Sequence, residues 1–255
     1  MKVKLLSVTP DALNLLLRTK GTRLAHAEDP AKWNTKKRNE HLSYMRDTIK
    51  SSWEFVTYVF HISGVTRAFT HQLVRTRAGS YAQESQRTVD VSDHEVLEPK
   101  AIKSNRLLHL NWDQGSAQAL ASYRVLLQQG AAPQDARGLL PTNITTSIIA
   151  QFNLRTLHEM AKLRLCTRTQ GEYQSVFREM RRLVVAEHPW VEKFGFMEVH
   201  CVAEGTCAFP RFGRKECKFY DPRLDRDAVS IDIRKRFWKE SAQEARPVVR
   251  DGKTM

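Results

Sequence analysis

The chain of 255 residues lacks any long apolar run. No stretch approaches the roughly 20 apolar residues that a membrane-spanning helix needs. The opening MKVKLLSVTPDALNLLL is interrupted by polar residues and Pro10, which is not typical of a signal peptide. Internal repeats and low-complexity linkers are also missing. These absences exclude a membrane protein and favour a cytoplasmic protein without membrane partners. The length fits one large domain or one domain with a tail.

Cysteine is scarce, with four residues at positions 166, 201, 207 and 217. That is too few for a disulfide scaffold of this length. The last three follow His200 closely enough to suggest a zinc site, but the CxxC spacing of common zinc knuckles is absent. We therefore predict ordinary reduced thiols and no metal. Zinc bound by His200, Cys201, Cys207 and Cys217 is the alternative.

Acidic residues are in the minority. The chain has 28 Asp and Glu against 41 Lys and Arg, a formal net charge of +13. This excess predicts anionic partners without specifying which anion. Nucleic acid, free nucleotides, a flavin pyrophosphate and a polyglutamylated folate all qualify. The basic residues near the C-terminus are interpreted as a solvated surface.

The apolar pattern predicts an α/β protein with helices packed on a small mixed sheet. Strands are expected over 2–9 and 54–63, and strand and loop over 88–104. A loop is expected over 20–39. Helices are expected over 10–19, 41–50, 65–74, 105–129 (interrupted near Gly115), 133–137, 144–165 and 172–186.

The densest polar cluster spans residues 71–87, HQLVRTRAGSYAQESQR. Arg75 and Arg77 lie two positions apart, and Ser80, Ser85 and Arg87 follow in a polar loop. Guanidinium groups and hydroxyls at this density are suited to holding phosphates and a planar heterocycle. A surface helix needs no such cluster, so the segment predicts a binding site.

A second candidate site lies within the predicted helix 144–165. Asn153 and Arg164 are eleven positions apart, which places them within about 20° of each other on one helix face. Polar groups at both ends of an apolar stripe would suit a ligand lying along the helix. The alternative is that Arg164 is a surface residue and that Arg155 and Glu159 form an ordinary i,i+4 ion pair.

Together the two motifs resemble the flavin-dependent thymidylate synthases, and the chain is identified as a divergent member of that family. The family's first pattern is Arg-His-Arg, seven residues, Ser, and an Arg two further on. It is matched by Arg75, Thr76, Arg77, Ser85 and Arg87. The second is matched by Ala136-Arg137, Leu140-Pro141, Asn153-Leu154-Arg155 and Leu163-Arg164. The resemblance covers roughly residues 40–190.

The resemblance implies which residues bind which group. It places on the FAD cofactor Ser52, Arg75, Thr76, Arg77, Asn153, Arg155 and Glu159. Around the pyrimidine nucleotide it places Gln72, Gln83, Glu84, Ser85, Gln86, Arg87, Arg137 and Arg164. The two residues assigned to catalysis are Arg164, which would stabilise charge on the pyrimidine carbonyl, and Ser85, which would position the substrate. It further implies a homotetramer with sites where subunits meet, a catalytic domain over 1–200 and a basic, Cys-containing extension over 201–255.

The implied reaction is C5-methylation of dUMP to dTMP with methylene-tetrahydrofolate and NADPH, in which the flavin carries the one-carbon unit. This chain departs from the family pattern around the ligands: Thr76 replaces the central His, Lys50 and Phe55 stand where His is common, Ala82-Gln83 replaces Asn-Glu, and Glu159 replaces Asn or His. Two alternatives therefore stay open. One is methylation or hydroxymethylation of another pyrimidine nucleotide (UMP or dCMP). The other is an inactive relative that binds nucleic acid, although we do not expect a nucleic-acid partner.

Overall fold

The computed structural model describes residues 1–23, 25, 29–48, 50–209 and 217. Its centre is a four-stranded sheet in the order β1-β2-β4-β3. The strands are β1 (Lys2–Val8), β2 (Thr57–Thr66), β3 (Gly79–Gln83) and β4 (Thr145–Asn153). Every pairing between them is antiparallel, so the predicted mixed sheet is wrong in this respect. The α/β class itself is confirmed.

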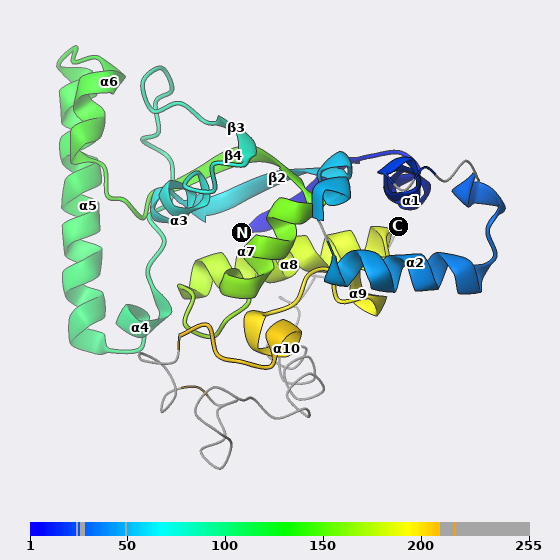
Figure 1. The fold of residues 1–255 in the computed structure, drawn as a ribbon. Helices are drawn as coiled ribbons and strands as arrows, with labels where there is room; N and C mark the ends of the chain where they lie inside the picture. The colour runs from blue at the N-terminus through cyan, green and yellow to red at the C-terminus, as the bar shows by residue number, and fades with distance from the viewer. Residues whose placement is uncertain (24, 26–28, 49, 210–216, 218–255) are drawn as a thin grey trace, which may run out of the picture.

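In the described part of the chain, six longer helices and several short ones surround the sheet, as Figure 1 shows. The longer ones are α1 (Ala12–Arg23), α2 (Thr35–Asp47), α3 (Arg67–Leu73), α5 (Arg106–Gln128), α7 (Leu154–Arg164) and α8 (Gly171–Glu187). The short ones are α4 (Lys100–Lys103), α6 (Pro133–Ala136), α9 (Trp190–Lys193) and α10 (His200–Glu204), with 3-10 turns at η1 (Pro30–Lys32), η2 (Lys50–Phe55) and η3 (Arg137–Leu139). None of the described helices combines the length and apolarity needed to cross a membrane.

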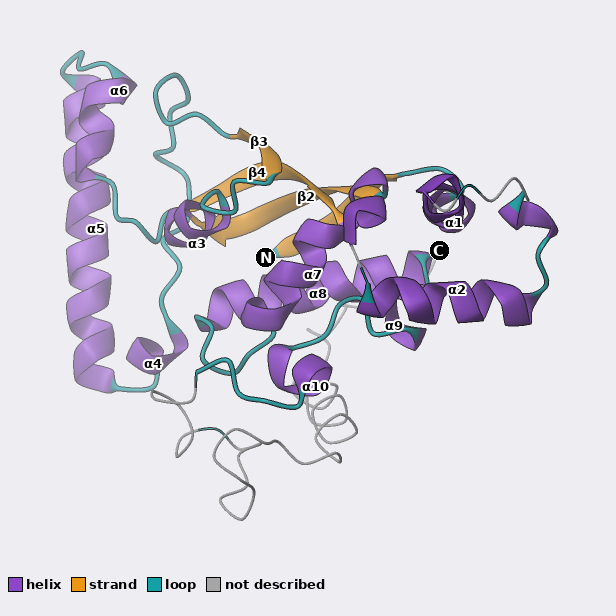
Figure 2. Ribbon diagram, in the orientation of Figure 1, coloured by secondary structure: helices purple, strands orange, loops and turns teal. Residues whose placement is uncertain are grey.

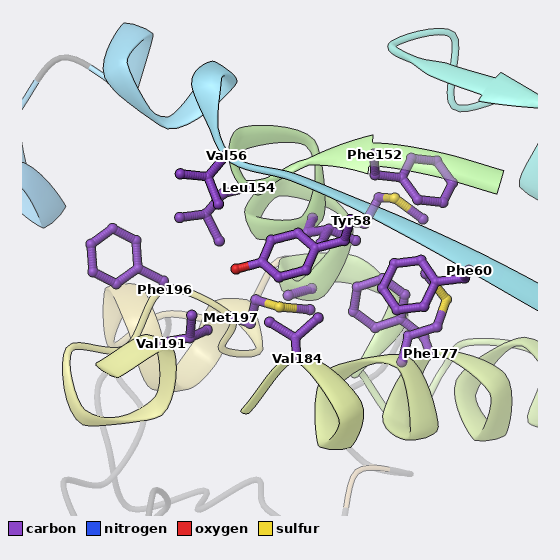
Figure 3. Packing of buried hydrophobic residues seen from close by; sticks show 14 of the residues in the cluster. Val56, Tyr58, Phe60, Phe152, Leu154, Phe177, Val184, Val191, Phe196 and Met197 are labelled. Atoms are coloured by element: carbon purple, nitrogen blue, oxygen red, sulfur yellow. The ribbon is translucent and has the colours of Figure 1, made fainter. Parts of the chain in front are cut away.

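The core lies between one face of the sheet and helices α7 and α8, which run beneath it (Figure 2). Alternate residues of β2 and β4 point into this core, and Tyr58 pairs with Phe152 and Phe60 with Ala150 across the two strands. Figure 3 shows Tyr58 and Phe60 packed towards Phe177 and the neighbouring side chains of α8. Full burial of each aromatic ring contributes about 1.5–3 kcal/mol, so this layer fixes the strands that carry the site.

The helix predicted over 144–165 is wrong in its first half. Residues Thr145–Asn153 form β4, and helix α7 begins only at Leu154. The run TTSIIAQF is continuous enough to fit a buried strand or a buried helix, and its β-branched residues favour the strand. Asn153 marks the change because its Oδ1 caps the new helix by accepting from the Thr156 amide at 2.8 Å.

Four other regions also differ from the predictions. Helix α5 is continuous through Gly115, because a single exposed Gly costs a helix only about 1 kcal/mol. The predicted loop 20–39 contains the end of α1 and the start of α2. Strand β3 was missed inside the polar motif because it is only five residues long and pairs with β4 alone. Within 88–104, the expected strand is reduced to an isolated bridge between Val96 and Ile144.

Candidate active site

A pocket of about 530 Å³ lies where the turn after α3 meets the start of α7. Its volume falls within the range of small-molecule sites in proteins. The residues that line it are Glu54, Thr76, Arg77, Ala78, Asn153, Arg155, Thr156, Glu159, Met160, Leu163 and Arg164. It therefore joins parts of both motifs that are about 80 positions apart in the sequence.

The turn that carries the first motif is fixed from two sides. The Tyr81 hydroxyl, on β3, lies 2.6 Å from the carbonyl oxygen of Thr76 and 3.1 Å from that of Leu73. Burial raises the pKa of Tyr81 to about 12, so the hydroxyl keeps its proton and acts as a donor. On the other side, the Thr156 hydroxyl of α7 donates to the carbonyl of Ala78 at 3.2 Å. The turn is thus held between β3 and α7.

Helix α7 presents its N-terminus at the pocket. Asn153, Arg155 and Thr156 all belong to its cap or first turn and line the cavity. The Arg155 guanidinium pairs with Glu54 of η2 at 2.5 Å, so the predicted Arg155–Glu159 pair is not the contact that this Arg makes. Free backbone N–H groups and the helix dipole make such a terminus favourable for anions.

Charge in the pocket is predominantly positive. Arg77, Arg155 and Arg164 line it together with two carboxylates, those of Glu54 and Glu159. One of these carboxylates is neutralised by Arg155. The remaining excess of guanidinium groups, together with the end of α7, suits a ligand that carries phosphate groups.

Arg164 is positioned by an aromatic ring that the sequence did not reveal. Its guanidinium carbon lies 4.4 Å from the ring centroid of Tyr173, on α8. The Tyr173 ring is fully buried, and this burial raises the pKa of its hydroxyl. The hydroxyl oxygen lies near Thr76 and Arg164, outside good hydrogen-bond geometry to either. A cation stacked on a buried ring is held by roughly 1–2 kcal/mol, which restricts where the Arg can reach.

Lys50 occupies a position where the family often has His, and the structure gives it a partner. His158 on α7 is 5% exposed. Its Nδ1 atom lies 2.8 Å from the carbonyl oxygen of Phe196. Its Nε2 atom lies 2.9 Å from the ammonium nitrogen of Lys50. Nδ1 therefore donates and Nε2 accepts, which is the neutral imidazole. Lys50 in turn reaches the Glu159 carboxylate at 3.4 Å, so a buried His orients a Lys beside the pocket.

This arrangement predicts a pH effect on folding stability. Burial, reinforced by Lys50 and Lys162, lowers the pKa of His158 from 6.5 to about 4. The unfolded chain takes up a proton at a higher pH than the folded one, so stability is complete above pH 6.5 and falls as the pH drops towards 4. From pH 7 to pH 5 the loss from this group is about 2 kcal/mol.

We expect His158→Asn to have a lower free energy of unfolding than the wild type at pH 7. Between pH 7 and pH 5, the variant should lose less of this free energy than the wild type, as measured by urea unfolding at both pH values. His71→Asn, at an exposed position on α3, is the matched control and should follow the wild type. Equal pH dependence in wild type and His158→Asn would show that His158 is not the titrating group.

The loop residues predicted to bind the nucleotide lie elsewhere on the chain. They begin at the far end of β3, about 13 Å from its start at the pocket edge. There Glu84 accepts from the Ser147 amide at 3.1 Å and pairs with His94 at 2.7 Å. Ser85 accepts from the Arg87 amide at 3.2 Å, and both side chains are exposed. None of the loop residues 83–87 lines the pocket.

The predicted residues therefore divide into groups. The pocket contains five of those assigned to the cofactor, together with the catalytic Arg: Thr76, Arg77, Asn153, Arg155, Glu159 and Arg164. Ser52 is buried in η2 and Arg75 is exposed, both outside the lining. The Gln72 amide donates to Gln170 at 2.6 Å. Gln83 donates to Thr70 at 2.7 Å, Gln86 is half-buried, and Arg137 is exposed and donates to the Gln134 carbonyl at 3.0 Å.

Sequence reasoning missed several residues that build the pocket, namely Glu54, Ala78, Tyr81, Thr156 and Tyr173. Thr156 carried a usable signal, because it stands three residues after an Asn that could cap a helix. Tyr173 carried none, because an aromatic residue on the apolar stripe of a helix is typical of a core position.

The fold and the pocket define an α/β protein with a pocket lined by guanidinium groups beside the first turn of a helix. Comparison with known proteins identifies the class. A family model described as thymidylate synthase complementing protein matches residues 4–190. The chain belongs to this family, which is that of the flavin-dependent thymidylate synthases, and the family resemblance of its two motifs is thereby confirmed.

Individual relatives support the same family assignment. The flavin-dependent thymidylate synthase of Pyrococcus abyssi is 34% identical over 164 residues, which cover 62% of this chain and 67% of that protein. That of Pyrococcus furiosus is 38% identical over 135 residues, covering 51% and 55%. That of Nitratidesulfovibrio vulgaris is 35% identical over 178 residues, covering 67% and 71%. The chain thus spans between about half and about seven tenths of the length of these relatives.

Proposed function

We propose that the protein is an FAD-dependent thymidylate synthase that methylates C5 of dUMP to give dTMP, using methylene-tetrahydrofolate and NADPH. The observation that carries this proposal is the pocket itself. It gathers five of the seven residues assigned to FAD, with Arg164, around the N-terminus of α7. Three guanidinium groups and a helix terminus suit the pyrophosphate of a dinucleotide cofactor, and the names of the relatives refer to a flavin.

In this proposal the bound flavin supplies the transfer of the one-carbon unit and of hydride. The chain's own residues bind and orient. Arg77 and Arg155 hold phosphate near the start of α7, and Arg164, stacked on Tyr173, faces the negative charge that develops on the pyrimidine carbonyl. Ser85 and Arg87 hold the nucleotide phosphate. Ser85 has no role as a nucleophile, because a Ser needs an adjacent base to be activated.

The proposal includes a site that is shared between chains. The FAD residues lie at one end of β3 and the nucleotide loop at the other, and none of the loop residues 83–87 lines the pocket. We infer that the loop of one subunit completes the pocket of another in a homotetramer. Helix α5 supports such an assembly, since Leu107, Leu108 and Leu110 are 72%, 50% and 54% exposed on it. A cytoplasmic location and a division into a catalytic domain over 1–200 and an extension over 201–255 belong to the same proposal.

Two measurements test the proposed function. The purified protein should have the absorption spectrum of a flavin, or bind added FAD with quenching of its fluorescence. With FAD, NADPH and methylene-tetrahydrofolate, it should then add the mass of one methyl group to dUMP and leave UMP and dCMP unchanged.

Other outcomes are equally informative. A gain of one methyl or hydroxymethyl group on UMP or dCMP would identify that nucleotide as the substrate in place of dUMP. Thr76, which lies beside Tyr173, is where the chain departs most clearly from its family. Absence of both flavin binding and product, with polynucleotide binding that weakens steeply with salt, would favour the inactive nucleic-acid-binding relative.

A further inference from the structure

Two positions at which the chain departs from its family are in contact beside the pocket. Lys50 of η2 stands where the family often has His, and Glu159 of α7 stands where it usually has Asn or His. They are 109 positions apart in the sequence, yet the Lys50 ammonium nitrogen lies 3.4 Å from Oε1 of the Glu159 carboxylate. Two positions that usually carry uncharged or weakly basic side chains therefore carry an ion pair here.

The Lys50 ammonium is held by two further groups. Nε2 of His158 lies 2.9 Å from it. The indole ring of Trp53 is fully buried, and its centroid lies 5.4 Å from the ammonium nitrogen, a distance at which the face of an aromatic ring attracts a cation. The Lys50 side chain is only 26% exposed, so its position is set mainly by the protein around it.

His158 can accept from Lys50 because its other ring nitrogen is already occupied. Nδ1 donates to the carbonyl oxygen of Phe196 at 2.8 Å, which leaves the lone pair on Nε2 as an acceptor. The Trp53 ring meets the imidazole edge-on, with 5.0 Å between the two centroids. Buried groups of the core therefore determine where the Lys50 ammonium lies.

Glu159 lies where a negative charge would oppose phosphate binding. It is one of two carboxylates that line the pocket, and its side chain is 54% exposed. The other carboxylate, that of Glu54, is paired with Arg155. Without a cation of its own, the Glu159 carboxylate would repel a phosphate group bound at the neighbouring guanidinium groups.

A second cation near Glu159 is engaged elsewhere. The Lys162 ammonium nitrogen is 3.9 Å from Oε2 of Glu159, but it is 2.9 Å from the carboxylate of Glu204 on α10. Lys162 therefore pairs mainly with Glu204. This leaves Lys50 as the closer and less committed of the two cations that face Glu159.

We propose that Lys50 is a positioning residue of the site, which offsets the charge of Glu159 and thereby allows the pocket to accept the phosphate groups of its ligand. Lys50 acts through Glu159, because it does not itself line the pocket. This role rests on the proposed function only for the identity of the ligand, since the same repulsion would act on any phosphate-bearing molecule.

Replacing Lys50 by Met tests this role, because Met keeps the length of the side chain and removes the charge. We expect Lys50→Met to bind FAD about fivefold more weakly than the wild type in fluorescence titrations, since the Glu159 carboxylate then repels the phosphates. Adding Glu159→Gln to the same chain should restore the affinity to within about twofold of the wild type. A direct contact between Lys50 and phosphate would instead give a loss that persists in the double variant.

Lys36→Met is the matched control for net charge. Lys36 is exposed on α2 and does not line the pocket, so this variant should bind FAD like the wild type. The midpoint of urea unfolding, measured for every variant, shows whether the fold is retained. If Lys50→Met does not fold, Lys50→Gln takes its place, because it removes the charge and keeps a donor for His158.

ADP separates the role of Lys50 from the proposed cofactor, because it carries a diphosphate without a flavin. The same pattern of loss and restoration with ADP, in a protein that does not bind FAD, would support the role of Lys50 and reject the flavin. Three results would each overturn the role: equal FAD binding by Lys50→Met and the wild type, a loss that Glu159→Gln does not restore, or a wild type that binds neither FAD nor ADP.

Discussion

Replacing Arg164 by Ala should lower kcat for the proposed methylation by about 10²–10³-fold while FAD binding is unchanged. The loss follows from removing a fixed positive charge that faces the carbonyl where negative charge develops. FAD binding should persist because Arg77 and Arg155 remain at the start of α7. Single-turnover absorbance of the flavin measures the chemical step, and a separate FAD titration measures binding.

Ser85→Ala is the matched control. It alters the other predicted catalytic residue, whose hydroxyl is exposed and accepts only a local backbone amide in the described structure, and it should keep measurable turnover. Tyr173→Leu should lie between the two, since it leaves the charge but removes the ring beneath it. Full activity in Arg164→Ala, or loss of FAD from it, would contradict the assigned role.

Gly79→Ala should destabilise the fold by about 1–3 kcal/mol, the usual cost of forcing an extra methyl into a filled space. A Cβ at this position would lie 2.6 Å from the Phe152 ring and 2.8 Å from the Tyr81 hydroxyl. Both neighbours must shift, and Tyr81 holds the carbonyls of the turn that carries Arg77. We therefore expect weaker FAD binding as well as a lower midpoint of urea unfolding.

Gly138→Ala supplies the control for this change, because no heavy atom lies within 4 Å of a Cβ there. The double variant Gly79→Ala, Phe152→Leu should be less destabilised than the sum of its single changes, since the smaller side chain vacates the space. An unchanged free energy of unfolding in Gly79→Ala would contradict this prediction and show that the Phe152 ring moves aside without loss of stability.

The sequence was sufficient to predict an element or the position of a site residue where one local signal dominated. Strand β1, helix α8 and the position of Arg77 could all be predicted from periodicity or motif. The sequence was not sufficient to predict the structure of residues 144–165, because a continuous apolar run there fits both a buried strand and a buried helix. The stack of Arg164 on Tyr173 could not be predicted from sequence spacing, because it depends on how helices α7 and α8 pack after folding.

Helix α7 sets different limits on two kinds of sequence change. Its outward residues Arg155, Glu159 and Leu163 line the pocket, while Leu157 and Ala161 are fully buried against the core. Substitution of an outward residue can therefore alter ligand choice without disturbing the fold. Insertion of a single residue would turn everything after it by about 100°, exposing the core side and burying the pocket side. Lineages of this protein should accept exchanges along α7 and reject changes in its length.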